Sequence, residues 1–250
     1  MNFLSLRFPR LFSAALFCAA IAGCSPSSEE NSSNNAAGNA TQNTASNSVQ
    51  STPSADAGSA VFTSTAQGLK GKLQKHYVDF SFSYPKDWEA KEIGQSEGAP
   101  NYVKLERVLK DDTKDDSKQN KGDFTLENFA VSYFSPPADS AKKAAIYPQL
   151  MAQISAPFQK TPGYKKVSEG KTKIGNLEAY EFRFENKIEK STRGPITNWT
   201  RVVLLPRPDA KKGVLLIMIA SSLAPEIKSA KDVGEKGQLP TILKSFKFGK

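Results

Sequence analysis

The chain is poor in the residues that many metal sites and enzymes use. It has two cysteines, Cys18 and Cys24, and one histidine, His76. A zinc cluster of histidine and thiolate ligands cannot be built from so few, so we expect no metal site of that kind. A Ser-His-Asp arrangement would have to use His76, and the sequence has no Gly-x-Ser-x-Gly turn to support one. His76 has polar neighbours and is predicted to be a surface histidine beside a strand.

The N-terminal apolar run is too short to span a bilayer. It covers residues 11–20, whereas a spanning helix needs about 20 apolar residues. Arg7 and Arg10 precede the run, and the small residues Ala22 and Gly23 follow it. A basic tip, an apolar stretch and small residues are the three parts of an export signal. Residues 1–23 are therefore predicted to be a signal peptide.

The four residues Ile-Ala-Gly-Cys at positions 21–24 resemble a bacterial lipobox, the cleavage and acylation site of lipoproteins. An ordinary secretory signal would need no cysteine at the first mature position. The resemblance implies two or three acyl chains, such as palmitate, on Cys24, and more than one chain gives stable membrane attachment. Ser25, rather than an aspartate, resembles sorting to the outer membrane on its periplasmic side; the inner membrane and the cell surface are the alternatives.

The stretch after Cys24 has no basic residue, and Val49, Val61 and Phe62 are almost its only larger apolar residues. Residues 25–67 consist mainly of Ser, Asn, Ala, Thr, Gln and Gly, with Glu29, Glu30 and Asp56 as the charged members. Such a composition cannot bury enough surface to offset the entropy of ordering. Residues 24–67 are therefore predicted to be a lipidated cysteine followed by a disordered linker, with a root-mean-square reach of about 35 Å.

Residues 68–250 have the length of one globular domain. Alternating apolar residues and turn signals predict strands at residues 78–84, 102–109, 124–134, 164–169, 177–185, 196–205 and 214–220. The last of these is apolar throughout, as a strand covered on both faces would be. Short turns between strands favour a mostly antiparallel sheet.

Apolar residues at helical spacing predict a helix over residues 140–160 and another at 239–246. Pro148 is expected in the first turn of the main part of the earlier helix, and Pro157 is expected to bend or end it. A further helix is predicted at residues 226–233, with Pro225 at its start. The resulting fold class is α+β, an α/β/α sandwich with an antiparallel sheet of six or seven strands.

Three stretches of the domain resemble PsbP-like domains. They are Phe-Ser-Phe-Ser-Tyr-Pro-Lys-Asp-Trp at 80–88, Gly-Asn-Leu-Glu-Ala-Tyr-Glu-Phe at 175–182, and Leu-Pro-Thr-Ile-Leu-Lys-Ser-Phe at 239–246. Similar domains occur in an extrinsic photosystem II protein, a nuclear Ran-binding factor and bacterial envelope lipoproteins. The resemblance covers most of residues 76–250. It implies the α/β/α sandwich and no single activity, because this fold carries unrelated binding roles.

The domain is strongly basic, with 32 basic and 22 acidic residues, a net charge of +10. An anionic partner is one explanation, either an acidic envelope protein or an anionic polymer. Yet 27 of the cations are lysines, scattered over loops and helix ends, which favours a role in solubility. Export makes nucleic acid an improbable partner.

Some charged and aromatic residues invite functional interpretations. Residues 110–123 are rich in Asp and Lys, and their spacing fits a solvated hairpin tip rather than a calcium loop.

Trp88 is expected to cap the core. Trp199 and Arg201 share one strand face, where packing in the core is favoured over an interaction hot spot. Glu181, Arg183 and Glu185 are predicted to form an exposed ion-pair ladder, with an acid–base pair as the alternative.

These observations predict a non-catalytic binding or assembly module of the cell envelope, anchored to a lipid bilayer through Cys24. No catalytic residue, cofactor or metal is expected. The alternative is a carboxylate-based hydrolase acting on envelope polymers, which would need two acids with separated pKa values in one cleft.

Overall fold

The computed structural model describes residues 58–110, 123–135, 140–191, 193–208 and 212–249. Its strands are β1 (Ser59–Thr63), β2 (Phe80–Pro85), β3 (Glu89–Glu92), β4 (Val103–Leu109), β5 (Phe124–Phe134), β6 (Lys165–Ile174), β7 (Leu177–Ile188), β8 (Ile196–Pro206), β9 (Gly213–Ser221) and β10 (Lys247–Phe248). Its helices are α1 (Gly71–Lys75), α2 (Ser140–Ser155), the 3-10 turn η1 (Phe158–Lys160) and α3 (Leu239–Ser245). None of the helices in these ranges has both the length and the apolarity needed to cross a membrane.

The strands form one large and one small sheet. The large sheet has seven antiparallel strands in the order β3-β4-β5-β9-β8-β7-β6, and the small one has the order β1-β2-β10. Strands β6, β7, β8 and β9 are successive hairpins, whereas β9 returns to pair with β5. The two-residue turn Gly175-Asn176 joins β6 to β7, with Gly175 at φ +56°, a conformation that favours glycine. The α+β class and the seven-stranded antiparallel sheet are as predicted.

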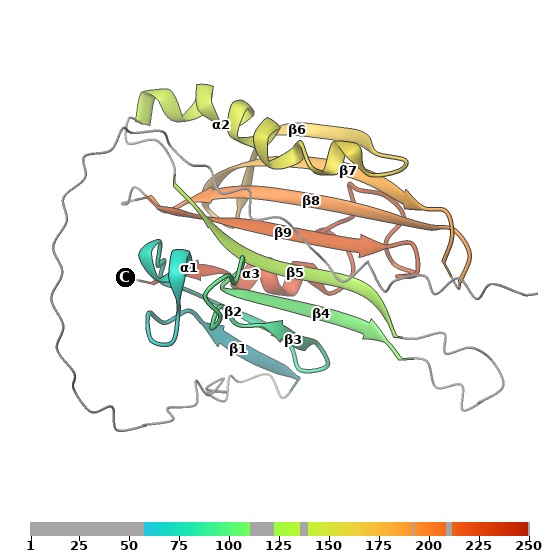
Figure 1. Cartoon of the computed structure of the whole chain (residues 1–250), viewed down its shortest axis with the longest axis horizontal. Coiled ribbons are helices and arrows are strands. Elements are labelled where there is room, and N and C mark those ends of the chain that lie inside the picture. Colours follow the sequence, from blue (N-terminus) through green and yellow to red (C-terminus); the bar gives the residue numbers. More distant parts are fainter. Residues whose placement is uncertain (1–57, 111–122, 136–139, 192, 209–211, 250) are drawn as a thin grey trace, which may run out of the picture.

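Both faces of the large sheet are covered (Figure 1). Helix α2 packs on one face, where Met151 contacts a cluster that includes Phe182 and Phe184 of β7. Helix α3 and the small sheet pack on the opposite face. Strand β9 lies between these two layers, and its side chains alternate between them. Leu216 and Met218 point toward α3, and Ile217 points toward α2. The apolar run at 214–220 therefore indicated a doubly covered strand correctly.

Aromatic packing joins the small sheet to α3. Phe80 and Phe82 of β2 are fully buried, and their rings lie 5.5 and 6.2 Å from the ring of Phe246, just after α3. Phe82 also meets Phe129 of β5 edge-on, with ring centroids 5.1 Å apart. Aromatic pairs at such separations add about 0.5–1.5 kcal/mol each beyond the area they bury. This cluster fixes the position of the C-terminus against the large sheet.

Several sequence predictions need correction. Residues 59–63 form β1, paired with β2, so the predicted linker cannot extend to residue 67; residues 24–57 lie outside the described part of the chain. The short apolar stretch Ala60-Val61-Phe62 explains the error, because Ala60 and Phe62 pack against the core and the Phe62 ring stacks on Phe82 at 5.4 Å. Residues 226–233 contain turns and bends rather than a helix. The short elements α1, β3 and β10 were not predicted.

Helix α2 ends before Pro157, as predicted, and η1 begins after it. Pro148, however, lies inside α2 rather than in a first turn. Proline cannot donate a backbone hydrogen bond, so the helix lacks one bond there. Packing of the apolar face on the sheet, through Met151 and Ile154, outweighs that local cost.

Replacing Met151 with alanine should lower the free energy of unfolding by about 2–5 kcal/mol, because its side chain is fully buried between α2 and the sheet. Chemical denaturation monitored by circular dichroism measures the change. Gln153→Ala, on the exposed side of the same helix, is the matched control and should shift stability by less than about 0.5 kcal/mol. Equal effects of the two changes would show that α2 does not pack as described.

Candidate functional site

Residues 222–238, which we call the covering segment, link β9 to α3 without regular structure. Four of its apolar side chains are buried in the core, at every third position: Ala224, Ile227, Ala230 and Val233. The helix predicted over residues 226–233 from Pro225 is absent, and these buried side chains belong to a segment of turns and bends. The segment instead lies across the sheet face that carries the odd-numbered residues 181–185 of β7, opposite α2.

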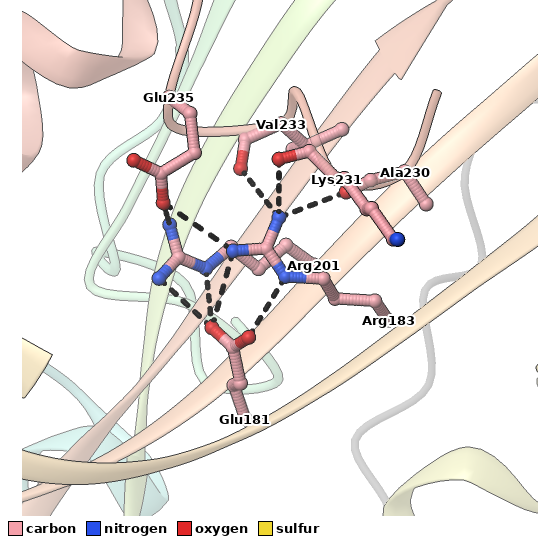
Figure 2. Close-up of polar contacts among 7 residues, drawn as sticks. All are labelled: Glu181, Arg183, Arg201, Ala230, Lys231, Val233 and Glu235. Carbon is pink, nitrogen blue, oxygen red and sulfur yellow. Dashed lines mark hydrogen bonds and ion pairs between the residues drawn. The ribbon is translucent and has the colours of Figure 1, made fainter. Parts of the chain in front are cut away.

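Arg183 attaches the covering segment to the sheet (Figure 2). It is 6% exposed, and its Nη1 donates to the carbonyl oxygens of Ala230 at 2.9 Å, Lys231 at 2.9 Å and Val233 at 3.2 Å. The carbonyls therefore have partners that a helix would otherwise supply. A buried carbonyl without a partner costs about 1–3 kcal/mol, so this side chain determines the path of the backbone.

Arg201 lies directly opposite Arg183 in the pairing of β7 with β8, which places two cations side by side. Glu181 neutralises both (Figure 2): its Oε1 accepts from Arg183 Nε at 2.8 Å and its Oε2 accepts from Arg201 Nε at 2.8 Å. Glu235 of the covering segment is the second carboxylate and accepts from Arg201 Nη1 at 3.0 Å. Like charges opposite each other destabilise a sheet, so the pair depends on these carboxylates.

A second buried charge holds the far end of the covering segment. Glu127 of β5 is fully buried and accepts from the backbone N–H of Gln238 at 3.3 Å. Arg107 donates to Glu127 at 2.8 Å and also to Glu226. Burial raises the pKa of Glu127, although Arg107 and the Gln238 amide both act to lower it. Thus Arg183 binds carbonyl oxygens in the middle of the covering segment, and Glu127 binds the backbone N–H of Gln238 at its end.

Two glycines bring the segment close to these charges. Gly234 and Gly237 have φ of +79° and +73°, a region that side chains rarely adopt. A Cβ at Gly234 would lie 2.7 Å from Arg201 Nη1, and one at Gly237 would lie 2.6 Å from Glu127 Oε1. Glycine is thus required at both positions by the turn and by the contact.

The predicted charged ladder on β7 is partly wrong. Ion pairs do form, but Arg183 is buried, and the covering segment overlies it. Burial tends to raise the pKa of Glu181, but hydrogen bonds and charge from Arg183 and Arg201 outweigh it, so the net pKa is lowered. Glu185 instead pairs with Lys165 at 3.4 Å. Glu181 and Glu185 therefore have different partners, since Glu181 is held as a carboxylate between two arginines and Glu185 lies beside Lys165.

The other singled-out residues have structural surroundings. Trp88 is buried and donates from Nε1 to the Gln238 side chain, and Trp199 is buried in the core as expected, which excludes a surface hot spot with the buried Arg201. His76 is half-buried rather than fully at the surface and stacks on Tyr133, with ring centroids 4.3 Å apart. Burial, and then the charges of nearby lysines, lower the pKa of His76.

Two sequence predictions fall largely or wholly outside the described residues. Cys24, the predicted lipidation site, is one, and residues 111–122 of the Asp/Lys loop are the other. Lys110 and Asp123, which flank the loop, form an exposed ion pair at 3.2 Å. Within the ranges that the structure describes, no group of three or more His, Cys, Asp or Glu side chains could hold a metal ion.

An open groove lies at the end of the molecule where the chain terminates. Its volume is about 540 Å³, within the range of roughly 300–1,000 Å³ of small ligand sites. It lies between the β6–β7 turn, the end of β8 and the end of α3 with β10. We call it the C-terminal groove; its lining is Ile174, Gly175, Asn176, Leu177, Arg207, Pro208, Lys244, Phe246, Lys247, Phe248 and Gly249.

The C-terminal groove combines an apolar floor with a cationic rim. Ile174 and Phe246 are buried, while Lys244 and Lys247 are exposed. Within the described part of the chain, neither lysine forms an ion pair. Sequence reasoning missed this site, because its three cations, at positions 207, 244 and 247, looked like part of a scattered basic surface.

No family model matches this chain, and no curated protein matches its sequence. Solved structures similar to it include LpqN, involved in cell envelope biogenesis of Mycobacterium tuberculosis, at 13% identity and a TM-score of 0.41, covering 77% of this chain and 92% of LpqN. The cyanobacterial PsbP of Synechocystis has 13% identity and a TM-score of 0.41, covering 78% of this chain and 94% of that one. The Ran-binding protein Mog1p of Saccharomyces cerevisiae has 12% identity and a TM-score of 0.35, covering 67% and 89%. At these identities and scores, the likenesses concern the fold and give no information on a shared activity.

Replacing Arg183 with methionine should lower the free energy of unfolding by about 3–5 kcal/mol, since it leaves three carbonyls of the covering segment unpaired and Glu181 with Arg201 alone. Hydrogen exchange should accelerate most at the amides of residues 222–238. The control is Glu235→Gln, which alters a 58% exposed carboxylate of the same cluster and should cost at most about 1 kcal/mol. Similar losses in both variants would contradict the role given to Arg183.

Asp232 should titrate at an unusually low pH. Lys236 at 2.9 Å, the Lys228 N–H at 3.0 Å and the Ser229 hydroxyl at 3.1 Å all donate to its carboxylate. They lower its pKa from 3.8 to about 2, so its stabilising effect is present above the unfolded value and is lost as pH falls toward 2. Carbon NMR should show a midpoint near 2 that rises in Lys236→Met but not in Lys228→Met, because Lys228 contributes only its backbone. A midpoint near 3.8 in the unaltered chain would refute the arrangement.

Proposed function

We propose that this chain is a lipid-anchored, non-catalytic binding or assembly module of the cell envelope. The observation that carries the proposal is the C-terminal groove, an open surface with an apolar floor and solvent-facing lysines. It has the features of a site that recognises another molecule: apolar contact area together with a few placed charges. The partner is an acidic envelope protein or an anionic polymer, and not a nucleic acid.

The buried acids support a binding role over a hydrolytic one. A carboxylate-based hydrolase needs an acid and a base in one accessible cleft. Glu181 is bound by two arginines, and Glu127 is fully buried between Arg107 and the Gln238 amide. Neither belongs to the lining of the C-terminal groove, which contains no carboxylate side chain among the described residues. We therefore favour the binding role over hydrolysis of envelope polymers.

The proposed location rests on the sequence around Cys24. A signal peptide of residues 1–23 would be removed, and acyl chains on Cys24 would hold the protein at the bilayer. Ser25 supports the outer membrane as the destination, with the domain on the periplasmic side. The domain begins at β1, some 34 residues after Cys24, so it could contact partners at a distance from the membrane surface.

The anchor is tested by expressing the full chain in bacteria with an alkyne-tagged palmitate and separating the membranes. The unaltered protein should carry the label and sediment with the outer membrane, whereas Cys24→Ser should carry none. Cys18→Ser, which changes the other cysteine of the chain, is the matched control and should keep both label and location. Label retained in Cys24→Ser would refute the anchor.

The binding role is tested with the same lipidated protein. Immobilised full-length protein should retain a defined set of solubilised envelope components and should release no soluble fragments from peptidoglycan beyond a heat-denatured sample. Release of fragments that is abolished by Glu181→Gln or Glu127→Gln would establish the hydrolase instead. Absence of any retained component would contradict the binding role.

A further inference from the structure

The C-terminal groove runs beside an open strand edge. Strand β10 pairs with β2 on one side and, in the described part of the chain, with no strand on the other. The N–H of Gly249 donates to the carbonyl of Asp79 at 3.0 Å, so Gly249 directs its backbone groups toward β2. Backbone direction alternates along an antiparallel strand, and Phe248 therefore directs its N–H and C=O away from β2, toward the groove.

Resting on the binding role proposed above, we infer that the C-terminal groove binds an extended, acidic peptide segment of a partner protein, which adds a strand beside β10. An exposed edge supplies hydrogen bonds to any peptide backbone and is a common mode of peptide recognition. The groove lies where the side chains of such a strand would be, because Phe246, Lys247 and Phe248 all line it.

The side chains around the edge define the composition of the peptide. Phe246 and Ile174 form a buried floor, and Leu177 and Phe248 remain partly exposed beside them. Every second residue of an added strand would point toward this floor, so apolar residues are expected at alternate positions. The remaining side chains would point to the rim.

The cations at the rim of the groove favour acidic residues in the bound peptide. Lys244 and Lys247 are exposed, and Arg207 lines the opposite side. Lys244 lies in the last turn of α3 and Lys247 on β10, and both residues line the groove beside the strand edge. Asp79 lies close to Gly249 at the end of β10 and is a carboxylate beside this edge. Opposite charges favour encounter and set the register of a partner.

A lipid fits the same features less well. An acyl chain needs an enclosed apolar cavity to leave water, whereas this groove is open along its length. The headgroup of a phospholipid would find lysines, but it would make no use of the outward N–H and C=O of Phe248. A peptide uses the backbone edge, the floor and the rim together.

Binding is measured by fluorescence anisotropy with the full chain and a labelled short peptide that alternates glutamate and valine. It should bind, and the matching peptide with lysine for glutamate should bind at least about tenfold more weakly. A glutamate–valine peptide methylated on its backbone nitrogens should also lose about tenfold or more, because it cannot donate to β10. Equal binding by the methylated peptide would overturn strand addition.

The site is located with neutral variants that keep the helix and strand intact. Lys244→Gln/Lys247→Gln should weaken binding about fivefold, while Lys160→Gln/Lys228→Gln, which removes two exposed cations elsewhere, should leave it unchanged. Circular dichroism confirms that both variants fold. Equal weakening in the two would mean that charge attracts the peptide without a site, and would overturn the assignment.

Two further outcomes separate this inference from the binding role on which it rests. If immobilised Lys244→Gln/Lys247→Gln protein still retains the same envelope components, the groove assignment fails and the binding role stands. If the unaltered chain retains none, both fail. Dihexanoylphosphatidylglycerol that binds through Lys244 and Lys247 while the peptide does not would overturn the peptide in favour of a lipid.

Discussion

The guanidinium of Arg183 joins two parts of the chain whose association no local pattern specifies. It extends from β7 and binds three carbonyl oxygens of the covering segment, and that segment closes one face of the sheet. Burying a cation is costly unless it is paired and hydrogen-bonded, and Glu181 supplies the pairing. The charge specifies one arrangement, because each of its donors has a defined acceptor. Ala224, Ile227, Ala230 and Val233 then add apolar burial beneath the segment.

At the end of the covering segment, a buried anion binds the backbone as the cation of Arg183 does in its middle. Glu127 accepts the N–H of Gln238 just where α3 begins, and Gly237 leaves room for that contact. A different path of the segment would leave its buried carbonyls without Arg183 and the N–H of Gln238 without Glu127, and each unpaired group costs about 1–3 kcal/mol. Helix α3 is thereby placed against Phe80 and Phe82, and its last residues reach β10. The position of the C-terminal groove thus follows from charges that lie outside it.

The charges in this domain divide into two groups with different roles. Arginines and glutamates of the buried clusters form ion pairs with one another, and these pairs stabilise the fold. Lysines 244 and 247 face solvent at the rim of an apolar groove. An exposed cation keeps its hydration until a partner replaces it, so it adds selectivity at a small cost in stability. That contrast is the physical basis of the binding role that we propose.

Periodicity predicted the strands well where burial differs between two faces. Strand β5 has the predicted bounds, and β7, β8 and β9 differ from theirs by at most three residues at either end. Prediction was weakest where side chains distant in sequence decide the backbone. Contacts of Phe62 with β2 accompany strand β1 at the end of a polar segment, and Arg183 binds an irregular backbone where a helix was predicted at 226–233. In the candidate site, Glu181 and Arg183 were predicted to form ion pairs on an exposed strand face, but their burial with Arg201 under residues 222–238 could not be inferred.

The amino-acid sequence by itself determined the α+β class, the antiparallel hairpins and the doubly covered β9, because alternation of apolar residues is a local record of which faces are buried. The lipobox resemblance at Cys24 also comes from the sequence alone, because it depends on four consecutive residues. Only the tertiary structure decided which charges are buried together and which lysines border a groove. These features bring together residues that are far apart in the chain. Arg107 pairs with Glu226, and Asn176 lines the same groove as Lys247. The pattern of apolar residues along the sequence does not indicate which distant residues become neighbours.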